Sequence, residues 1–312
     1  MTREEQIRRA RARKRRHQAM IARRITAAVI LALILIPVIY GIYSRSRVKS
    51  LQKNVNSLEK QLKDSDMKQK QLQKQLKDIQ KELKEKEAQL QKQAEATTDN
   101  PDKPNVYLTF DDGPSANTDT ILDTLEKYNV RATFFCIARE GQENADRYKR
   151  IVANGNTLAM HSYTHDYGKV YADLDAFKKD VTGISDFLFQ ITGVRPKFYR
   201  FPGGSSNTVS KVPMRQCINY LNEQGIIYFD WNAQNDDATT EGKDYTAKQL
   251  LEAAMNSIHQ SGDNVVLLMH DEQTKAETAK ALPSLIKKLK SENYDILPIT
   301  EDTPLVQHVS YK

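Results

Sequence analysis

Two short segments of the chain carry the residue types that metal-assisted hydrolysis requires. The first, "TFDDGP" at residues 109–114, places two adjacent carboxylates after the apolar run "NVYL", and Gly-Pro then ends the strand. The second, "HSYTH", separates His161 and His165 by four positions, a spacing that brings both imidazoles to one face of a turn or helix. Two imidazoles and one carboxylate make a three-ligand metal site with an open position. Together the segments predict that one Asp binds the metal while the other serves as a base.

Each segment also has an ordinary interpretation when it is taken alone. An Asp of the first would serve as the N-cap of the helix that "TDTILDTLEKY" predicts. Two histidines four positions apart occur by chance in many proteins. The rest of the chain must therefore decide between chemistry and these simpler roles.

Other titratable residues follow apolar runs far along the chain. Arg200 comes after "KFY", Asp230 and Trp231 come after "IIYF", and His270 comes after "VVLLM". If these runs are parallel strands, their carboxyl ends meet at one edge, so we expect the residues to share one site with the two segments. Taken singly, Arg200 has the alternative of a surface salt bridge, His270 that of a core histidine, and Trp231 that of a core residue rather than a sugar-stacking platform.

The elements that must position this site alternate between strands and helices. Seven apolar runs are the expected strands: "VYLTF", "RATFFCI", "TLAMH", "KFYRF", "IIYFDW", "NVVLLMH" and "DILPI". The expected helices between them include "ADLDAFKKDVTGISDFLFQIT", "MRQCINYLNEQ", "TAKQLLEAAMNSIHQ" and "ETAKALPSLIKKLKSEN". This alternation predicts an α/β fold with a parallel sheet covered by helices. Seven repeats favour a closed barrel, and an open doubly wound sheet is the alternative.

Four motifs in this order resemble those of the polysaccharide deacetylases of the NodB-homology type, carbohydrate esterase family 4. They are "TFDDGP", "HSYTH", "RFPGGSSN" from Arg200 to Asn207, and "LLMHD" around His270. The resemblance covers roughly residues 104–300 and implies a distorted (β/α) barrel of seven to eight strands. The whole plan of the chain is similar to that of membrane-anchored bacterial peptidoglycan N-acetylglucosamine deacetylases.

The resemblance implies a role for each residue at a matched motif position. Asp111 would be the general base, with Arg200 orienting it, and His270 would be the general acid. The metal ligands would be Asp112, His161 and His165, and the metal would be zinc or another divalent ion such as cobalt. In the substrate cleft, the backbone N–H of Gly203 would help to bind the oxyanion and Leu268 would line the pocket for the acetyl methyl group, with Trp231 at the cleft wall.

One motif departs from the usual family pattern. The segment "DWNAQNDDA" has Trp231 but lacks the second Trp of the family's Asp-Trp pair, and Asp237 is the best match for the carboxylate that tunes the acid histidine. Gly203 also stands where an aromatic residue is common. We expect removal of N-acetyl groups from peptidoglycan amino sugars, with release of acetate and N-acetylglucosamine favoured. The alternatives are N-acetylmuramic acid, another polysaccharide, de-O-acetylation, or a non-catalytic envelope scaffold that binds sugar.

The positive charge of the chain lies almost entirely at its N-terminus. The 312 residues carry a formal net charge of +7. Residues 1–24 contain ten Lys or Arg and two Glu, a local charge of +8, so the remaining 288 residues carry −1. Because the excess is confined to this expected cytoplasmic tail, the composition does not favour nucleic acid as a partner.

An uncharged apolar run, "ITAAVILALILIPVIYGIY" at residues 25–43, follows the basic tail. Nineteen residues of helix reach about 29 Å, close to the ~30 Å hydrocarbon thickness of a bilayer, so we expect a single membrane-spanning helix. A cleaved signal peptide is the alternative, but the run exceeds the usual ~7–15 apolar residues and no small-residue cleavage pattern closes it. The excess of basic residues before the run predicts a cytoplasmic N-terminus and an extracellular domain that faces the cell wall.

An apolar heptad pattern occupies residues 48–93 and predicts a coiled-coil stalk. The pattern runs through Val48, Leu51, Val55, Leu58, Leu62, Leu72, Leu76, Ile79, Leu83 and Leu90, and is interrupted by Ser65, Gln69 and Lys86. The partner would be a second copy of the chain or a helix of another protein, and the alternative is a solitary or frayed helix. Residues 94–104 are then a polar, Pro-containing linker, and residues 105–312 form the catalytic domain.

Cys136 and Cys217 are too few for a disulfide scaffold. One bridge is compatible with an oxidising compartment, but the sequence does not place the two sulfurs near each other. We assign neither thiol a function.

Overall fold

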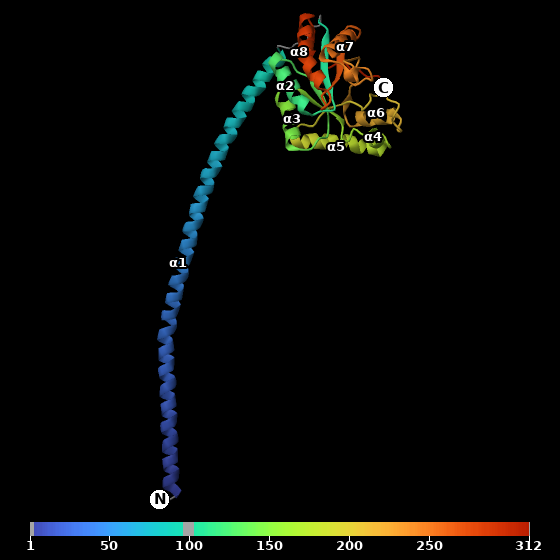
Figure 1. Cartoon of the computed structure of the whole chain (residues 1–312). Coiled ribbons are helices and arrows are strands. Elements are labelled where there is room, and N and C mark those ends of the chain that lie inside the picture. Colours follow the sequence, from blue (N-terminus) through green and yellow to red (C-terminus); the bar gives the residue numbers. More distant parts are fainter. Residues whose placement is uncertain (1–2, 96–102, 312) are drawn as a thin grey trace. The chain divides into compact units, whose positions relative to one another are not determined.

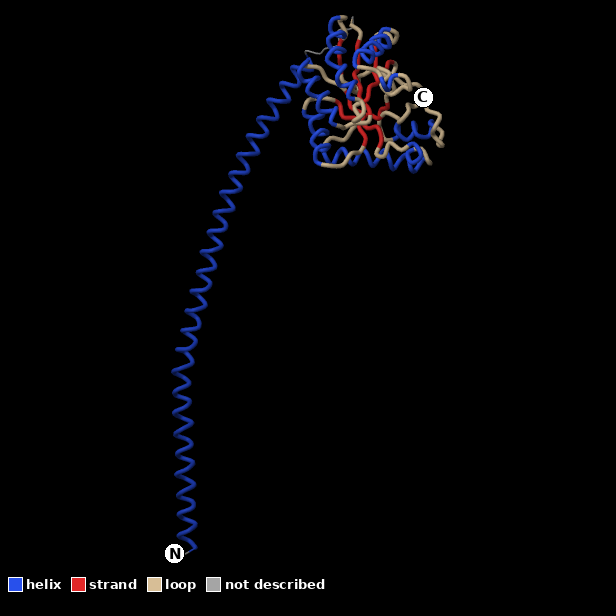
Figure 2. Tube along the Cα trace, in the orientation of Figure 1, coloured by secondary structure: helices blue, strands red, loops and turns tan. Residues whose placement is uncertain are grey.

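The computed structural model describes residues 3–95 and 103–311, and the chain divides into two compact units, one up to Ala88 and one from Gln89 onward. Figure 1 labels their elements, and Figure 2 separates helices from strands. Most of the expected linker at residues 94–104 lies outside the described residues, since 96–102 are not described.

The first unit is formed by one helix, α1 (Arg3–Glu95), which has Pro37 inside it and continues past Ala88. It runs without a break through the basic tail, the apolar run at residues 25–43 and the heptad segment at residues 48–93. Its apolar part is long and hydrophobic enough to cross a membrane. The heptad residues are exposed along the described part of the helix, with Leu58 63% and Leu62 64% accessible. The seam therefore has no partner within the described chain, and the coiled coil stays a prediction.

The second unit contains a parallel sheet, as expected. Its strands are β1 (Asn105–Asp111), β2 (Thr133–Ile137), β3 (Thr157–Ser162), β4 (Phe198–Tyr199), β5 (Ile227–Tyr228), β6 (Ala233–Gln234), β7 (Asn264–His270) and β8 (Asp295–Leu297). Their order is β5-β4-β3-β2-β1-β7-β6, and β8 pairs beside the first half of β1. All seven expected strands form, and β6 is an addition. No ladder joins β5 to β6 among the described residues, so the sheet is a half-barrel rather than a closed barrel.

Helices follow most of the strands, as the alternating pattern predicts. They are α2 (Ala116–Tyr128), α3 (Gln142–Ala153), α4 (Tyr167–Val170), α5 (Leu174–Thr192), α6 (Met214–Glu223), α7 (Ala247–His259) and α8 (Ala276–Ser291), with a short 3-10 turn η1 (Gly242–Asp244). Ser115 is the N-cap of α2 and forms a capping box with Thr118. The alternative of an Asp N-cap is therefore wrong, and neither carboxylate of "TFDDGP" caps this helix.

The core lies on both faces of the two central strands. In β1, Leu108 and Phe110 belong to a large cluster of sheet and helix side chains, while Tyr107 belongs to a second cluster on the opposite face. Burial on both faces is characteristic of parallel strands covered by helices, and it makes β1 and β7 rigid. Their register pairs Asp111 with His270 at the carboxyl ends, so the sheet itself brings together two residues that are far apart in the sequence.

Candidate active site

A cleft of about 370 Å³ lies at the carboxyl ends of the strands. Its lining includes nine of the ten predicted site residues: Asp111, Asp112, His161, His165, Gly203, Trp231, Asp237, Leu268 and His270. The tenth, Arg200, is 0% exposed and contacts Asp111 from within the core. The expectation that distant strand ends form one site is therefore met. The alternatives of a surface salt bridge for Arg200 and a core role for His270 do not hold.

Asp112, His161 and His165 form a group that fits a metal ion. Their potential ligand atoms lie within 4.8 Å of one another. Asp112 Oδ1 is 3.1 Å from His165 Nε2 and 3.5 Å from His161 Nε2. This oxygen is buried and accepts no hydrogen bond from the described residues, which is costly unless a cation binds it. One carboxylate and two imidazoles suit zinc and related divalent ions.

A backbone carbonyl sets the orientation of the first histidine. His161 Nδ1 lies 2.8 Å from the carbonyl oxygen of Arg200, which can only accept a hydrogen bond. The Nδ1–H therefore points to this carbonyl, and the lone pair of Nε2 faces the other two ligands. Burial lowers the pKa of His161 below its ordinary value, against the opposing charges of Asp111 and Asp112. The neutral imidazole is the form that binds metal.

Two of the three metal-site residues have left-handed backbone conformations, with φ of 71° at Asp112 and 49° at His165. Such conformations are costly for residues other than glycine and persist where surrounding contacts hold them. At Asp112, the guanidinium of Arg139 donates to the backbone carbonyl from Nε and Nη2, each at 3.4 Å.

Arg200 fixes the orientation of the Asp111 side chain. Arg200 Nη1 donates to Asp111 Oδ1 at 2.8 Å and to Thr109 Oγ1 at 2.7 Å. Its Nε and Nη2 donate to the carbonyls of Phe229 and Asp230 at 3.1 and 2.9 Å. A buried guanidinium with this set of partners is satisfied, and it fixes one oxygen of Asp111. The other oxygen, Oδ2, lies 3.9 Å from His161 Nε2, beside the metal-site residues.

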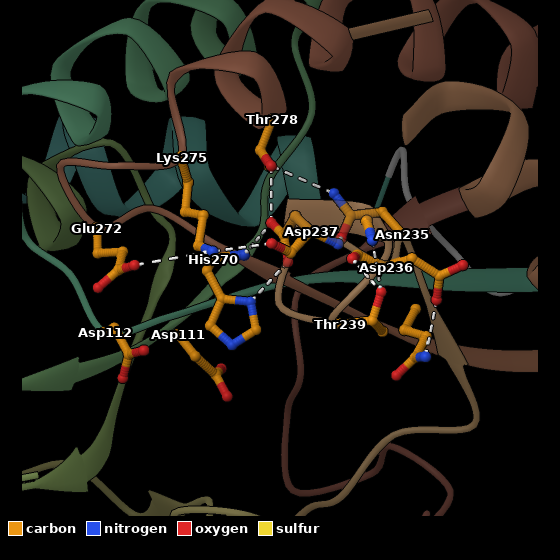
Figure 3. A network of polar contacts seen from close by, with 12 residues as sticks. Asp111, Asp112, Asn235, Asp236, Asp237, Thr239, His270, Glu272, Lys275 and Thr278 are labelled. Carbon is orange, nitrogen blue, oxygen red and sulfur yellow. Dashed lines mark hydrogen bonds and ion pairs between the residues drawn. The ribbon is translucent and has the colours of Figure 1, made fainter. Parts of the chain in front are cut away.

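His270 and Asp237 form an ion pair on the other side of the cleft, drawn in Figure 3. His270 Nδ1 lies 2.7 Å from Asp237 Oδ1, and the backbone N–H of His270 donates to Asp237 Oδ2 at 3.0 Å. Thr278 Oγ1 donates to the same Oδ2 at 2.7 Å, and Asn235 Nδ2 in turn donates to Thr278 at 3.3 Å. Asp237 thus has the position expected of the tuning carboxylate.

This ion pair shifts both titrations. Burial disfavours the charged imidazole, but the hydrogen bond and charge of Asp237, with the charges of Asp111 and Asp112, raise the pKa of His270 to about 9. The pKa of Asp237 is lowered, because its bonds to His270 and Thr278 outweigh its burial. The raised pKa of His270 contributes stability that is fully present below the ordinary histidine pKa of ~6.5 and is lost as pH rises through about 9. The lowered pKa of Asp237 contributes stability that is present above the ordinary Asp pKa of ~3.9 and is lost as the carboxylate is protonated at lower pH.

The remaining wall of the cleft includes Gly203, Trp231 and Leu268, as expected. Gly203 and Gly204 have φ of 77° and 81°, and a Cβ at Gly204 would lie 3.1 Å from the Trp231 ring. Glycine at 204 therefore permits both the turn and the close approach of the indole. The Arg200 guanidinium also lies 5.9 Å from the Trp231 ring centre, which helps to fix this ring in the wall.

Several residues of the site were not predicted. Tyr167, Gln234, Glu272 and Lys275 also line the cleft, and Lys275 Nζ donates to the backbone carbonyl of Asp237 at 2.8 Å. Tyr167 directly follows the histidine motif, which is a usable signal. The others come from a two-residue strand or from the loop before α8, and they act through contacts that no local pattern records.

Comparison with known proteins identifies the family. The family model described as polysaccharide deacetylase matches residues 98–219. YheN of Bacillus subtilis (strain 168), which is described as a putative polysaccharide deacetylase, is 34% identical over 213 residues, which cover 68% of this chain and 72% of YheN. The peptidoglycan-N-acetylmuramic acid deacetylase PdaC of the same organism is 30% identical over 208 residues, which cover 66% of this chain but only 40% of PdaC.

A solved structure agrees with these matches. The catalytic domain of a peptidoglycan N-acetylglucosamine deacetylase from Eubacterium rectale is 35% identical, with a TM-score of 0.63. The match covers 69% of this chain and 97% of that domain. With the ligand triad, the buried Asp111–Arg200 pair and the His270–Asp237 pair in place, the chain belongs to the polysaccharide deacetylase family, the NodB-type hydrolases of carbohydrate esterase family 4.

Proposed function

We propose that this protein is a zinc-dependent hydrolase that removes N-acetyl groups from peptidoglycan amino sugars, with N-acetylglucosamine favoured, and releases acetate. The observation that carries the proposal is the placement of three kinds of group around one cleft. A metal-ligand triad (Asp112, His161 and His165) lies beside a carboxylate base, Asp111, and a histidine whose pKa of about 9 keeps it protonated at neutral pH, His270.

The residues around the cleft can divide the work of amide hydrolysis. Asp112, His161 and His165 would hold a divalent metal, which would supply polarisation of the acetyl carbonyl and acidification of water. Asp111 accepts a proton from the attacking water at Oδ2, because Arg200 occupies Oδ1. His270 donates its Nε2 proton to the departing sugar nitrogen, while its Nδ1 stays bonded to Asp237. The backbone N–H of Gly203 contributes to oxyanion binding and Leu268 to the acetyl pocket.

Two observations bear on the choice of sugar. The match to the Eubacterium rectale catalytic domain, at 35% identity over 97% of that domain, supports N-acetylglucosamine. The match to PdaC, at 30% identity, makes N-acetylmuramic acid the second candidate. Acetate release from defined muropeptides that carry only one acetylated sugar would separate the two.

The proposal is tested by measuring acetate release from purified peptidoglycan by the full chain in detergent. We expect chelation to abolish release and added zinc to restore it. The reason is that no described side chain beside Asp111 can replace a metal ion in polarising the carbonyl and acidifying water. Cobalt is the comparison ion. No release by folded, zinc-loaded protein on peptidoglycan, chitin or xylan would contradict the proposal and favour a non-catalytic sugar-binding scaffold.

We further propose that residues 25–43 are a single-pass membrane anchor, with residues 1–24 in the cytoplasm and the catalytic domain at residues 105–312 outside, facing the wall. The apolar part of α1 supports the anchor, and the excess of basic residues at 1–24 supports the orientation. Two of the similar proteins, PdaC and the Eubacterium rectale domain, are peptidoglycan deacetylases, which supports an outward-facing catalytic domain.

The exposed seam of α1 leads us to propose that residues 48–93 form a parallel two-stranded coiled coil with a second copy, with residues 94–104 as the linker beyond it. In the first two heptads, Val48 and Val55 occupy one core position and Leu51 and Leu58 the other, a combination that favours parallel dimers, whereas the later heptads place Leu at the first of these positions. A shared membrane anchor also gives both copies the same direction.

A cysteine at position 58 tests this pairing. In the full chain, Leu58→Cys is expected to yield a covalent dimer on mild oxidation, because the two substituted side chains face each other in a parallel, in-register pair. Lys60→Cys, on the outer face of the same helical turn, is the matched control and should stay monomeric. The native Cys136 and Cys217 are buried and should not interfere. Equal cross-linking of both variants, or of neither, would rule the pairing out.

A further inference from the structure

A buried carboxylate from α5 holds the loop between the two histidine ligands. Asp180 is 7% exposed and lies in the first half of α5. It accepts hydrogen bonds from Ser162 Oγ at 2.9 and 3.1 Å, from the backbone N–H of Tyr163 at 2.9 Å, and from the backbone N–H and hydroxyl of Thr164 at 3.1 Å each. The described donors to Asp180 therefore all lie at residues 162–164, between His161 and His165.

The Ser162 hydroxyl extends this hold to the second ligand. Because the hydroxyl donates to Asp180, its lone pairs are free to accept from the loop. They receive the backbone N–H of Thr164 at 3.2 Å and that of His165 at 2.8 Å. A continuous chain of hydrogen bonds thus runs from Asp180 through Ser162 to the backbone of a metal ligand.

The conformation of His165 explains why such a hold is needed. Its φ of 49° lies in the left-handed region, which is unfavourable for a residue other than glycine. The backbone stays there only where its surroundings compensate for this cost. The hydrogen bonds that converge from Asp180 and Ser162 are contacts of this kind, and without them the loop is free to relax and to move the His165 imidazole away from Asp112.

The close approach of α5 to the loop supports the same conclusion. A Cβ at Gly183 would lie 3.3 Å from Cδ2 of the Tyr163 ring, so glycine lets the helix pack tightly against this side chain. Gly183 follows Asp180 by three positions and therefore lies on the same face of α5. Asp180 and Gly183 therefore both face the loop at residues 162–164.

We propose that Asp180 is a positioning residue of the metal site: it preorganises the backbone that carries His165, and thereby sets metal affinity, without itself touching the metal. The proposal rests on the metal-dependent function proposed above. The positioning role requires only that the geometry of the metal ligands depend on the hydrogen bonds that hold their backbone and side chains. Loss of such outer partners typically costs about 10–100-fold in metal affinity or activity.

Asp180→Asn in the full-length protein is the test. The amide removes one acceptor and turns an N–H₂ group toward the loop's own donors, so we expect zinc to bind about 10–100-fold more weakly in competition with a chromophoric chelator. The visible spectrum of the cobalt-loaded variant should also change, because that spectrum reports ligand geometry. Asp186→Asn is the matched control, since Asp186 lies on the same helix but pairs with Arg195 at 2.9 Å. It should keep wild-type zinc affinity and the wild-type cobalt spectrum.

Milder variants keep the proposal testable if Asp180→Asn fails to fold. Ser162→Ala and Thr164→Val each remove a side-chain donor to Asp180 and should weaken zinc binding by smaller factors. Where the double variant folds, Ser162→Ala combined with Asp180→Asn should cost less zinc affinity than the two single losses together, because both act through one hydrogen-bond chain.

The outcomes separate this inference from the function on which it rests. Wild-type zinc affinity and an unchanged cobalt spectrum in Asp180→Asn, with only a lower melting temperature, would overturn the positioning role and leave Asp180 a structural residue. The same applies if Asp180→Asn is unfolded and Ser162→Ala binds zinc normally. Failure of the wild-type protein to bind zinc at all would instead overturn the proposed metal-dependent function.

Discussion

Asp111→Asn is expected to lower kcat/KM for acetate release by about 10²- to 10⁴-fold, the range that general-base catalysis supplies. The change preserves the shape of the side chain and lets Arg200 keep a hydrogen-bond partner at the position of Oδ1. It removes the basic oxygen that lies beside the metal-site residues. Zinc affinity should stay near the wild-type value, because the ligand triad does not include Asp111.

The informative measurement pairs steady-state acetate release with zinc titration on the same preparation. Asp146→Asn, at an exposed position of α3, makes the same chemical change away from the cleft and should leave both quantities unaltered. A variant at position 111 that binds zinc normally and releases acetate at the wild-type rate would refute the base assignment. Loss of zinc together with activity would show that Asp111 acts mainly on the metal.

His270→Gln is expected to lower amide hydrolysis at neutral pH by a similar factor, about 10²- to 10⁴-fold. The wild-type rate should fall as pH rises through about 9, because His270 then loses the proton that it donates to the leaving nitrogen. The glutamine variant should lack this alkaline limb. Asp237→Asn should instead move the limb toward the ordinary histidine pKa of ~6.5, since the neutral amide no longer stabilises the imidazolium.

A substrate with a better leaving group distinguishes proton donation from other roles of His270. An activated acetate ester such as 4-nitrophenyl acetate departs without protonation, so the His270→Gln variant should hydrolyse it at close to the wild-type rate. Equal losses on the ester and on the glycan amide would mean that His270 acts in binding or in holding the site. An alkaline limb that persists near pH 9 in the variant would assign that titration to another group.

The sequence predicts the residues that line this site better than it predicts the residues that hold them in position. Asp111, Asp112 and His270 are recognisable because parallel strands end where they stand, and β1 and β7 are long apolar runs. The strand β6 has only two residues, Ala233 and Gln234, which is too short a segment to show a periodic pattern. Short elements of this kind form because their neighbours hold them.

The partners of the catalytic groups lie far away in the sequence, and this explains most of what was missed. Thr278 contacts Asp237 from 41 positions further on, and Asp180 contacts Ser162 from 18 positions further on. Arg200 belongs to a recognisable motif. Its complete burial, however, depends on hydrogen bonds to the backbone carbonyls of Phe229 and Asp230, which approach it only in the folded chain. A hydroxyl or carboxylate on a helix has no local feature that reveals which loop it will contact.

The pairing of Asp111 with His270 across neighbouring strands also has a consequence for biosynthesis. The two residues are 159 positions apart, so the ribosome completes the proposed base, the proposed metal ligands and Arg200 well before it reaches the proposed acid. Any nascent chain that stops short of β7 lacks both the proposed proton donor and the strand that pairs with β1 along its whole length. Such chains are therefore expected to release no acetate from glycan.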